Sequence, residues 1–152
     1  MTKWLRNIWD EVARPLILRP HRVQCAALCT RNAGNDREVL LITSRGTGRW
    51  IIPKGWPIEG LDGAGTARQE AWEEAGVCAD SVAPEPVGQF SYNKILKDGS
   101  AQSVLTSVYQ IQVAELAEDF PEAHQRKRRW FSPTKAAEQV REPELRDLLL
   151  QL

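Results

Sequence analysis

The apolar residues of this 152-residue chain follow two different periods, which divide the chain into predicted strands and predicted helices. Apolar positions are nearly continuous over residues 23–30, as expected for a strand that is buried on both faces. A turn rich in Asn, Gly and Asp follows, and residues 38–43 predict the returning strand of a hairpin. Residues 87–96 and 101–113 predict two more strands, because the Lys-Asp-Gly-Ser sequence between them is typical of a hairpin turn.

Helical spacing marks the C-terminal end of the chain. Ser132 and Pro133 are a typical N-cap and first helical residue, so we expect one helix over residues 133–140. A second helix is expected over residues 143–152. The leucines of this second helix share one face: Leu145, Leu148, Leu149 and Leu152.

Residues 1–20 are predicted to form an N-terminal amphipathic helix and an extended connector, ahead of one domain over residues 21–152. The apolar positions of this helix are Trp4, Leu5, Ile8, Trp9 and Val12. We expect the helix to dock on its own domain or on a dimer mate, and the alternative is a helix that lies on a membrane surface. No apolar run reaches the length of a transmembrane helix or of a signal peptide.

A further helix is predicted in the middle of the chain, after a glycine-rich loop. It begins at Asp62 or at Thr66, since both are suitable N-caps. It ends at Ala75, because Gly76 occupies the position of a helix-terminating glycine. Small residues on one stripe would let this helix lie close to a sheet: Ala67, Ala71 and Ala75.

The carboxylates of Glu70, Glu73 and Glu74 stand at i, i+3 and i+4, so they fall within one sector of this helix. Such neighbouring like charges destabilise a helix by about 0.2–0.5 kcal/mol per pair. Oxygen ligands on one face suit a hard divalent cation, Mg²⁺ or Mn²⁺. The alternative is an acidic face that is only solvated, as charge runs on exposed helices commonly are.

The spacing around these glutamates resembles the signature of the Nudix hydrolases. The signature runs Gly, five residues, Glu, seven residues, Arg-Glu, apolar, any, Glu-Glu, any, Gly, apolar. Its positions hold Gly55, Leu61, Gln69, Glu70, Ala71, Glu73, Glu74, Gly76 and Val77 in this chain. Leu61 stands where the family usually has Glu. Gln69 replaces an Arg that helps to hold the metal-binding carboxylates, although its amide can still donate hydrogen bonds.

The resemblance implies an α+β fold, an α/β/α sandwich of Nudix type with a mixed, curved sheet. It also implies a hydrolase that cleaves a pyrophosphate bond with Mg²⁺, or Mn²⁺, as its cofactor. The catalytic residues would be Glu70, Glu73 and Glu74, and these glutamates would hold the metal together with the Gly55 carbonyl. The bound cation would neutralise phosphate charge and lower the pKa of a water molecule.

A carboxylate would then take the proton of the attacking water. We expect this base to be Glu74 or a carboxylate of the acidic loop over residues 115–122. The carboxylates considered in that loop are Glu118, Asp119 and Glu122.

Two weaker segments resemble the diphosphoinositol polyphosphate phosphohydrolases, namely Ser44-Arg45 with the Arg-Trp-Ile-Ile-Pro that follows, and the basic run at residues 126–129. The residues expected to contact substrate are Arg22, Ser44, Arg45, Lys54 and Arg128. Several cations around one acidic site favour a small molecule with many phosphates, of the dinucleoside polyphosphate or inositol pyrophosphate type. Nucleoside triphosphates and sugar nucleotides are also compatible with the signature.

The composition argues against some partners. Twenty Lys and Arg balance twenty Asp and Glu, so no net charge favours nucleic acid or an anionic membrane as a partner. Three cysteines exclude a fully paired disulfide framework, and Cys25 and Cys29 on one strand would be ~13 Å apart, too far to bridge. Reduced cysteines and a cytoplasmic monomer or homodimer are therefore expected.

Two other classes of function stay open from the sequence. One is a Nudix-fold module that senses a phosphorylated ligand without cutting it, which the departures at Leu61 and Gln69 motivate. The other is a protein-interaction domain that works through its N-terminal tryptophan helix. The three mutually repelling glutamates favour the enzyme over both, and phosphate release with Mg²⁺ would separate it from them.

Overall fold

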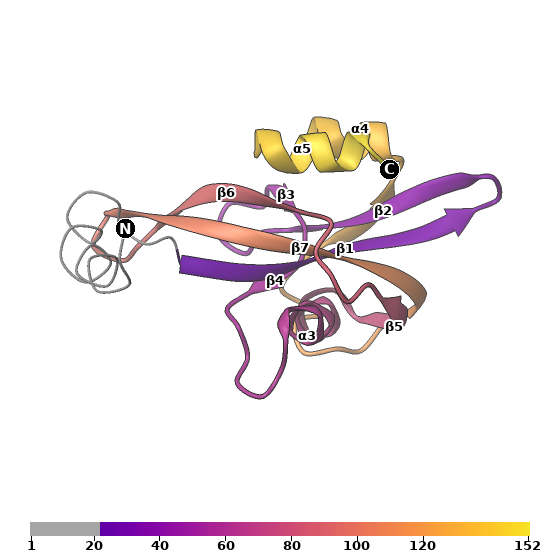
Figure 1. Ribbon diagram of the computed structural model, residues 1–152, viewed down its shortest axis with the longest axis horizontal. Coiled ribbons are helices and arrows are strands. Elements are labelled where there is room, and N and C mark those ends of the chain that lie inside the picture. Colours follow the sequence, from indigo (N-terminus) through magenta and orange to yellow (C-terminus); the bar gives the residue numbers. More distant parts are fainter. Residues whose placement is uncertain (1–21) are drawn as a thin grey trace, which may run out of the picture.

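The computed structural model describes residues 22–152, so the predicted N-terminal helix and connector lie outside the described residues. The elements in chain order are β1 (Arg22–Ala33), β2 (Asp36–Thr43), β3 (Trp50–Ile51), β4 (Lys54–Gly55), α3 (Gly63–Ala75), β5 (Val77–Val82), β6 (Gly88–Ile95), β7 (Ala101–Leu116), β8 (Arg128–Phe131), α4 (Pro133–Gln139) and α5 (Pro143–Leu150). Over this range the strands form one sheet, with α3 on one face and α4 and α5 on the other (Figure 1). The predicted α/β/α sandwich is confirmed, while the domain boundary stays a prediction.

The sheet is mixed, as expected. β1 and β7 run parallel at its centre, in a register that extends from Arg22 opposite Val104 to Thr30 opposite Gln112. The other pairings are antiparallel, with β2 and β4 on β1, β3 and β8 on β2, and β5 and β6 on β7. Because β1 is covered on both faces, its residues from Gln24 to Thr30 are buried, which explains their nearly continuous apolar pattern.

The sheet separates two cores. On one face, Leu28 of β1 packs with side chains of α4 and α5, including Leu145 and Leu149. On the other face, Ala27 packs with Ile111 and with α3. The alanine stripe of α3 makes this second contact and is fully buried: Ala67, Ala71 and Ala75. Adjacent residues of β1 therefore serve opposite cores, as strand alternation requires.

The boundaries of α3 resolve one alternative. Asp62 is the N-cap, since its side chain accepts a hydrogen bond from the Gly65 N–H at 2.7 Å. Thr66 is instead buried within the first turn, and its hydroxyl accepts from the Ile58 N–H at 3.2 Å. Gly76 ends the helix in the left-handed conformation, with a φ of 68°.

The structure also extends the predicted strands. β5 was not expected, because register shifts around Ala79 interrupt the alternation that identifies a strand. β7 continues to Leu116, so Glu115 belongs to this strand, and the acidic loop begins after Leu116. The two last residues of β7, Glu115 and Leu116, pair with Cys78 and Val77 of β5.

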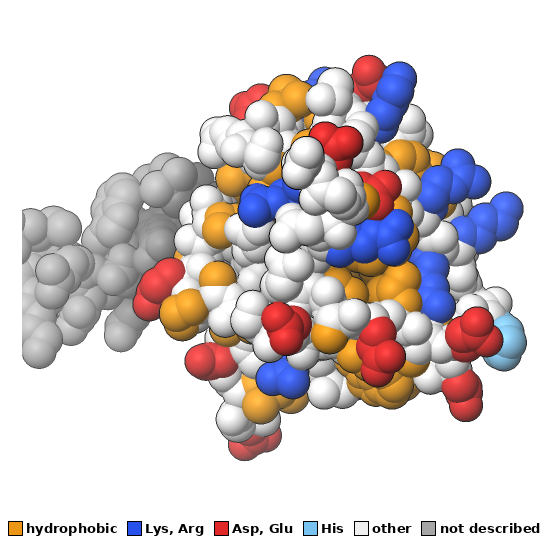
Figure 2. Space-filling view, turned by 90° about the vertical axis from the view of Figure 1, so that its right-hand side faces the viewer, with side chains coloured by type: hydrophobic (Ala, Val, Ile, Leu, Met, Phe, Trp, Pro, Cys, Tyr) orange, Lys and Arg blue, Asp and Glu red, His pale blue; other side chains and the backbone are white. Residues whose placement is uncertain are grey.

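Surface features agree with the balanced composition. The face drawn in Figure 2 carries both basic and acidic side chains, with hydrophobic ones between them. Cys25 and Cys29 are buried in β1 and unpaired. None of the helices within residues 22–152 has the length and hydropathy needed to cross a membrane. The cytoplasmic setting and the oligomeric state stay predictions.

Replacing Gly76 by alanine should destabilise the protein strongly. A Cβ there would lie 2.8 Å from the Ala117 carbonyl oxygen, in a conformation that L-residues avoid. We expect Gly76→Ala to lower the free energy of unfolding by roughly 2–4 kcal/mol, from the left-handed backbone and from overpacking. Gly34→Ala is the matched control, since Gly34 has a φ of 67° but nothing within 4 Å of its added Cβ. Chemical denaturation measures both, and equal losses would contradict the packing argument.

Candidate functional site

A cavity of about 640 Å³ lies where β4, the buried face of α3 and two loops meet, and it is called the central cavity below. Its lining residues are Gln24, Ser44, Arg45, Gly46, Ile51, Lys54, Gly55, Trp56, Glu70, Glu74, Tyr92, Lys94, Glu122 and Arg126. Carboxylates and cations thus face the same space, from segments that are far apart in the sequence.

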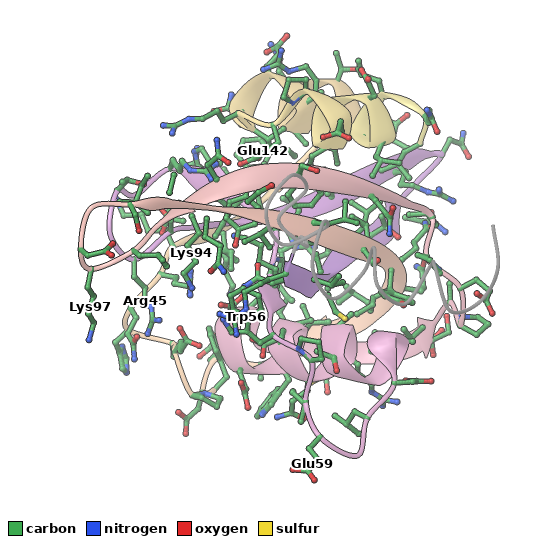
Figure 3. The ribbon with its side chains drawn as sticks, turned by 60° about the vertical axis from the view of Figure 1, so that its left-hand side comes forward. Arg45, Trp56, Glu59, Lys94, Lys97 and Glu142 are labelled. Carbon is green, nitrogen blue, oxygen red and sulfur yellow. The ribbon has the colours of Figure 1, made fainter. Side chains whose placement is uncertain are left out.

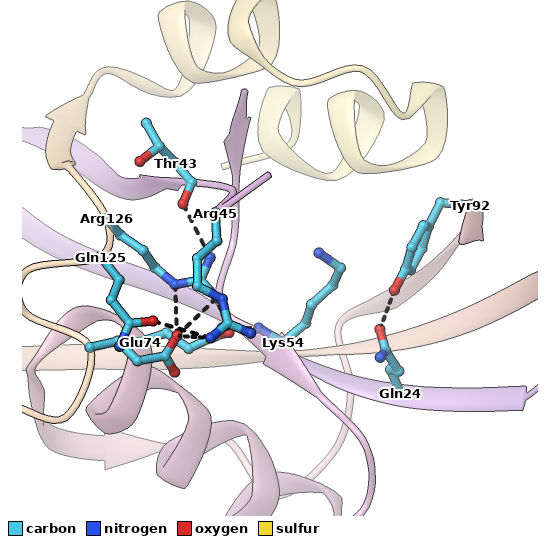
Figure 4. Close-up of polar contacts among 9 residues, drawn as sticks. Gln24, Thr43, Arg45, Lys54, Glu74, Tyr92, Gln125 and Arg126 are labelled. Carbon is cyan, nitrogen blue, oxygen red and sulfur yellow. Dashed lines mark hydrogen bonds and ion pairs between the residues drawn. The ribbon is translucent and has the colours of Figure 1, made fainter. Parts of the chain in front are cut away.

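Glu74 is a buried carboxylate of the cavity wall that contacts two other segments (Figure 4). One carboxylate oxygen accepts a hydrogen bond from the Lys54 main-chain N–H at 2.9 Å. The other accepts from the Arg126 guanidinium at 2.8 Å. Burial raises the pKa of Glu74, and the positive charge of Arg126 opposes this rise. The contact joins α3 to β4 and to the segment that precedes β8.

Arg126 makes further contacts that fix this segment. Its guanidinium donates to the Thr43 carbonyl at 3.1 Å and pairs with Glu122 at 3.1 Å. The Arg126 side chain is only 6% exposed. A single guanidinium therefore links the end of β2, helix α3 and the acidic loop.

Glu70 lies directly against Gly55, and their expected role as ligands of one metal stays a prediction. A Cβ on residue 55 would overlap the Glu70 carboxylate, so only glycine permits this approach. Burial raises the pKa of Glu70 to about 7, and the negative charges of Glu74 and Glu73 add to the rise. Two carboxylates of one helix thus reach the central cavity, and within residues 22–152 Glu70 forms no ion pair.

Glu73 belongs to the same helix but does not line the cavity. Its carboxylate accepts a hydrogen bond from the Gln69 amide at 2.9 Å, which is the kind of bond expected of Gln69. Leu61 is 45% exposed and lies away from the carboxylates, against a separate surface hollow that includes Trp72. Among residues 22–152 no three acidic, histidine or cysteine side chains surround a common point, so a metal would be held by fewer side chains or after a rearrangement.

Of the expected substrate contacts, Ser44, Arg45 and Lys54 line the cavity. Burial lowers the pKa of Lys54 to about 8, and its ammonium lies 5.1 Å from the centre of the Tyr92 ring. Arg45 donates to the Gln125 side chain at 3.1 Å (Figure 4). Arg22 lies at the edge of the site, over the Trp56 ring.

Arg128 is placed elsewhere, so a substrate contact through it is not supported. Its guanidinium donates to the Ala75 carbonyl at 2.7 Å and stacks on Phe120, which closes the C-terminal end of α3. Arg126 is the residue of the basic run that reaches the cavity. Because β8 begins only at Arg128, strand alternation could not identify Arg126.

A second cavity of about 560 Å³ adjoins the first and shares Ser44, Arg45 and Arg126 with it. Lys127 and His124 also line this second cavity.

Three carboxylates of the acidic loop were considered as the base that takes the proton of the attacking water. Of these, Glu122 lines the central cavity, whereas Glu118 and Asp119 are exposed.

Sequence reasoning missed six lining residues: Gln24, Gly46, Ile51, Trp56, Tyr92 and Lys94. Gln24 did carry a signal, since a polar residue within a buried apolar strand needs a partner. That partner is Tyr92, whose hydroxyl donates to the Gln24 amide oxygen at 2.5 Å. Burial raises the pKa of Tyr92 to about 12, so the hydroxyl keeps the proton that it donates.

Sequence comparison relates this chain to known proteins. The model of the NUDIX domain family matches residues 20–152. Human diphosphoinositol polyphosphate phosphohydrolase 3-beta is 34% identical over 110 residues, which cover 71% of this chain and 62% of the relative. The mouse 3-alpha protein is 38% identical over 112 residues, with the same shares covered. The chain therefore spans less than two thirds of the length of these relatives.

Solved structures share the fold. An Ap4A hydrolase of C. elegans superposes with a TM-score of 0.59 at 20% identity, over 87% of this chain and 95% of that one. The NUDIX domain of Shewanella oneidensis NrtR, complexed with ADP ribose, gives 0.64 at 17% identity, over 99% of this chain and 96% of that one. At these identities the likeness concerns the fold alone.

The raised pKa of Glu70 predicts a pH dependence of stability in metal-free protein. As the pH rises from about 4.5 to about 7, the unfolded chain releases this proton while the folded chain still holds it. The free energy of unfolding should therefore fall across this window. Glu70→Gln should reduce the fall, and Glu115→Gln, at an exposed position of β7, should leave it unchanged. Denaturation at several pH values tests this, and identical pH slopes for wild type and Glu70→Gln would contradict it.

Removing the Arg126 guanidinium should leave Glu74 buried without its cation. We expect Arg126→Met to lower the free energy of unfolding by roughly 3–5 kcal/mol at pH 8, the usual loss when one partner of a buried pair is removed. Adding Glu74→Gln to this variant should recover part of the loss, because the two residues are coupled. Arg141→Met, at an exposed position, is the control. Additive effects of the two single changes would argue against the coupling.

Proposed function

The chain belongs to the NUDIX family, and on that premise we propose that it hydrolyses a pyrophosphate bond in a phosphate-rich small molecule. The observation that carries the proposal is the central cavity, where the carboxylates of Glu70 and Glu74 face the cations of Lys54, Arg45 and Arg126. In such a cavity the cations would bind a polyanion, and the carboxylates would position a metal ion and the attacking water beside it. Both requirements are met by side chains of the described residues.

The donor set fits a hard divalent cation, Mg²⁺ or Mn²⁺. Glu70 and Glu74 present carboxylate oxygens to the central cavity beside Gly55, and Glu73, which lies outside the cavity lining, would join them only after a rearrangement. Burial raises the pKa of Glu70 most, and the repulsion from Glu74 and Glu73 that adds to this rise is the kind that a bound cation relieves. When bound, the cation would supply Lewis-acid activation of a water molecule and neutralise phosphate charge.

Other residues of the chain would bind the phosphates, leave room for the Glu70 carboxylate and accept a proton. Lys54 and Arg45 would bind phosphate oxygens and stabilise the charge that develops on the transferring and leaving groups, whereas Arg126 holds Glu74 and Glu122 in place. Gly55 keeps the wall of the cavity open to the Glu70 carboxylate. Glu74, or Glu122 of the acidic loop, would accept the proton of the attacking water, since both carboxylates line the cavity.

The substrate class follows from the number of cations. A sugar nucleotide has two phosphates and would leave most of these cations unpaired, whereas a ligand with four or more phosphates would engage more of them. The relatives named diphosphoinositol polyphosphate phosphohydrolases support this class. We therefore favour a dinucleoside polyphosphate or an inositol pyrophosphate.

The alternative is a module of this fold that binds a phosphorylated ligand without turnover. The engagement of both Glu74 oxygens by donors of the chain itself favours it, together with Leu61 and Gln69 in the signature. A ligand that raises the melting temperature without phosphate release would identify such a module.

The decisive experiment is a substrate panel assayed with Mg²⁺, with Mn²⁺ and with a chelator, and read by phosphate release and product mass. The panel contains a dinucleoside tetraphosphate, a diphosphoinositol polyphosphate, a nucleoside triphosphate and a sugar nucleotide. We expect turnover that needs the metal and is highest for the ligands richest in phosphate. Turnover that is unchanged by the chelator, or fastest with the sugar nucleotide, would contradict the respective part of the proposal.

Loss of either cavity carboxylate should disable the enzyme. Glu70→Gln and Glu74→Gln should each lower kcat by roughly 10²–10³-fold, the usual loss of one group that stabilises developing charge. Both should also shrink the rise in melting temperature that Mg²⁺ causes in the wild type. Glu118→Gln, an exposed position outside the cavity lining, is the control. Near-normal kcat in both cavity variants would refute the assignment of the site.

A further inference from the structure

A hollow of about 550 Å³ lies between α3, β5 and the loop that precedes α3, and it is called the outer hollow below. It shares no lining residue with the central cavity. The positions that α3 contributes are spaced by three and four residues, so they form one face of the helix. The lining residues are Leu61, Gly65, Arg68, Gln69, Trp72, Val77, Cys78 and Ala79.

Leu61 and Trp72 give the outer hollow an apolar lining at the surface. Leu61 is 45% exposed, and Trp72 is half-buried and packs in neither of the two cores. Val77 belongs to the second core and also lines the hollow, so the apolar lining is continuous with the interior. Contiguous apolar side chains at a surface mark a site of interaction. The outer hollow therefore fits an apolar partner.

Both departures of this chain from the Nudix signature lie in the outer hollow. Leu61 stands where the signature has Glu, and Gln69 stands where it has Arg. Each change replaces a charged side chain by an uncharged one. A charge at either position would be costly beneath an apolar cover, because it would lose its water. The two changes together suit a hollow that apolar side chains cover.

We propose that residues 4–12 of this same chain cover the outer hollow with their apolar side chains. These side chains recur at helical spacing, so a helix would present all of them on one side. They are Trp4, Leu5, Ile8, Trp9 and Val12. Glu11 stands seven positions after Trp4 and borders this side. It would pair with Arg68 of the hollow, which is exposed and forms no ion pair within residues 22–152.

The described part of the chain begins within reach of the outer hollow. The Arg22 guanidinium carbon lies 4.8 Å from the centre of the Trp56 ring. Trp56 opens the loop that leads to Leu61, and five residues span at most ~18 Å. Figure 3 shows this loop passing from Trp56, beside the sheet, to Glu59 at its outer end. Residues 13–21 connect the proposed cover to Arg22, and nine extended residues span about 30 Å.

The first test measures melting temperatures of the full chain. Leu61→Ser should lower the melting temperature by roughly 3–6 °C, because it removes a leucine that the cover would bury. In a chain that also carries Trp4→Ser and Trp9→Ser, the same change should cost less than about 1 °C, since Leu61 would then be exposed. Leu150→Ser is the matched control. This leucine is 55% exposed on α5, on the opposite face of the sheet, so both backgrounds should give it the same small shift.

The second test replaces Trp9 by the photo-crosslinking residue benzoylphenylalanine, in a mixture of unlabelled and isotope-labelled full chains. After irradiation, mass spectrometry should find position 9 joined to the segments around Leu61 or Trp72 of the same chain. Equal losses from Leu61→Ser in the two backgrounds, or crosslinks to another face, would overturn the inference.

Two further outcomes would assign the segment to a different partner. Crosslinks between labelled and unlabelled chains would mean that a second copy covers the hollow, which overturns docking within one chain. Binding of the wild type to phosphatidylserine vesicles that is lost with Trp4→Ser and Trp9→Ser, together with no crosslink to the hollow, would place the segment on a membrane surface and also overturn it.

Discussion

A carboxylate taken out of water needs hydrogen-bond donors, and the arrangement of this protein around Glu74 follows from that need. Its donors are the main chain of Lys54 and the guanidinium of Arg126, which belong to segments on either side of α3 in the sequence. Satisfying one buried charge therefore fixes β4 against the helix and draws the segment before β8 to the same place. These segments form part of the wall of the central cavity, and β1 and β6 complete it with Gln24, Tyr92 and Lys94.

The position of β4 has a second effect, on Glu70. With Lys54 held by Glu74, the next residue is Gly55, and the absence of a side chain there lets the Glu70 carboxylate approach the main chain. The result is an unfavourable concentration of negative charge in a partly dry site. Burial of the alanine stripe on the neighbouring face of α3 stabilises the helix and offsets this cost. One face of α3 thus stabilises the fold through its alanines, and the other face supplies carboxylates to the central cavity.

The features that the sequence predicted are the local ones. Glu70 and Glu74 are four residues apart on one helix, so helical geometry alone brings them together. Arg126 and Tyr92 reach the same cavity from segments 52 and 68 residues away from their partners, and no local period could reveal this. The choice of Arg128 within the basic run had the same limit, since the residue of that run that lines the cavity is Arg126, which precedes the short strand β8. β5 was missed because irregular pairing hides its alternation.

The parallel pairing of β1 with β7 also determines the order in which the protein can be assembled. Facing residues such as Arg22 and Val104 are about 80 positions apart, and α3, which lies between these strands in the sequence, packs on both of them. On the ribosome, the hairpin of β1 and β2 emerges before α3 and β7, with the β7 side of β1 still open. Such long-range contacts make folding slow, because the intervening chain must be closed before they form. A nascent chain that ends before Arg126 therefore contains the glutamates without the guanidinium that accommodates them, and the cavity becomes complete only after residue 126 has been added.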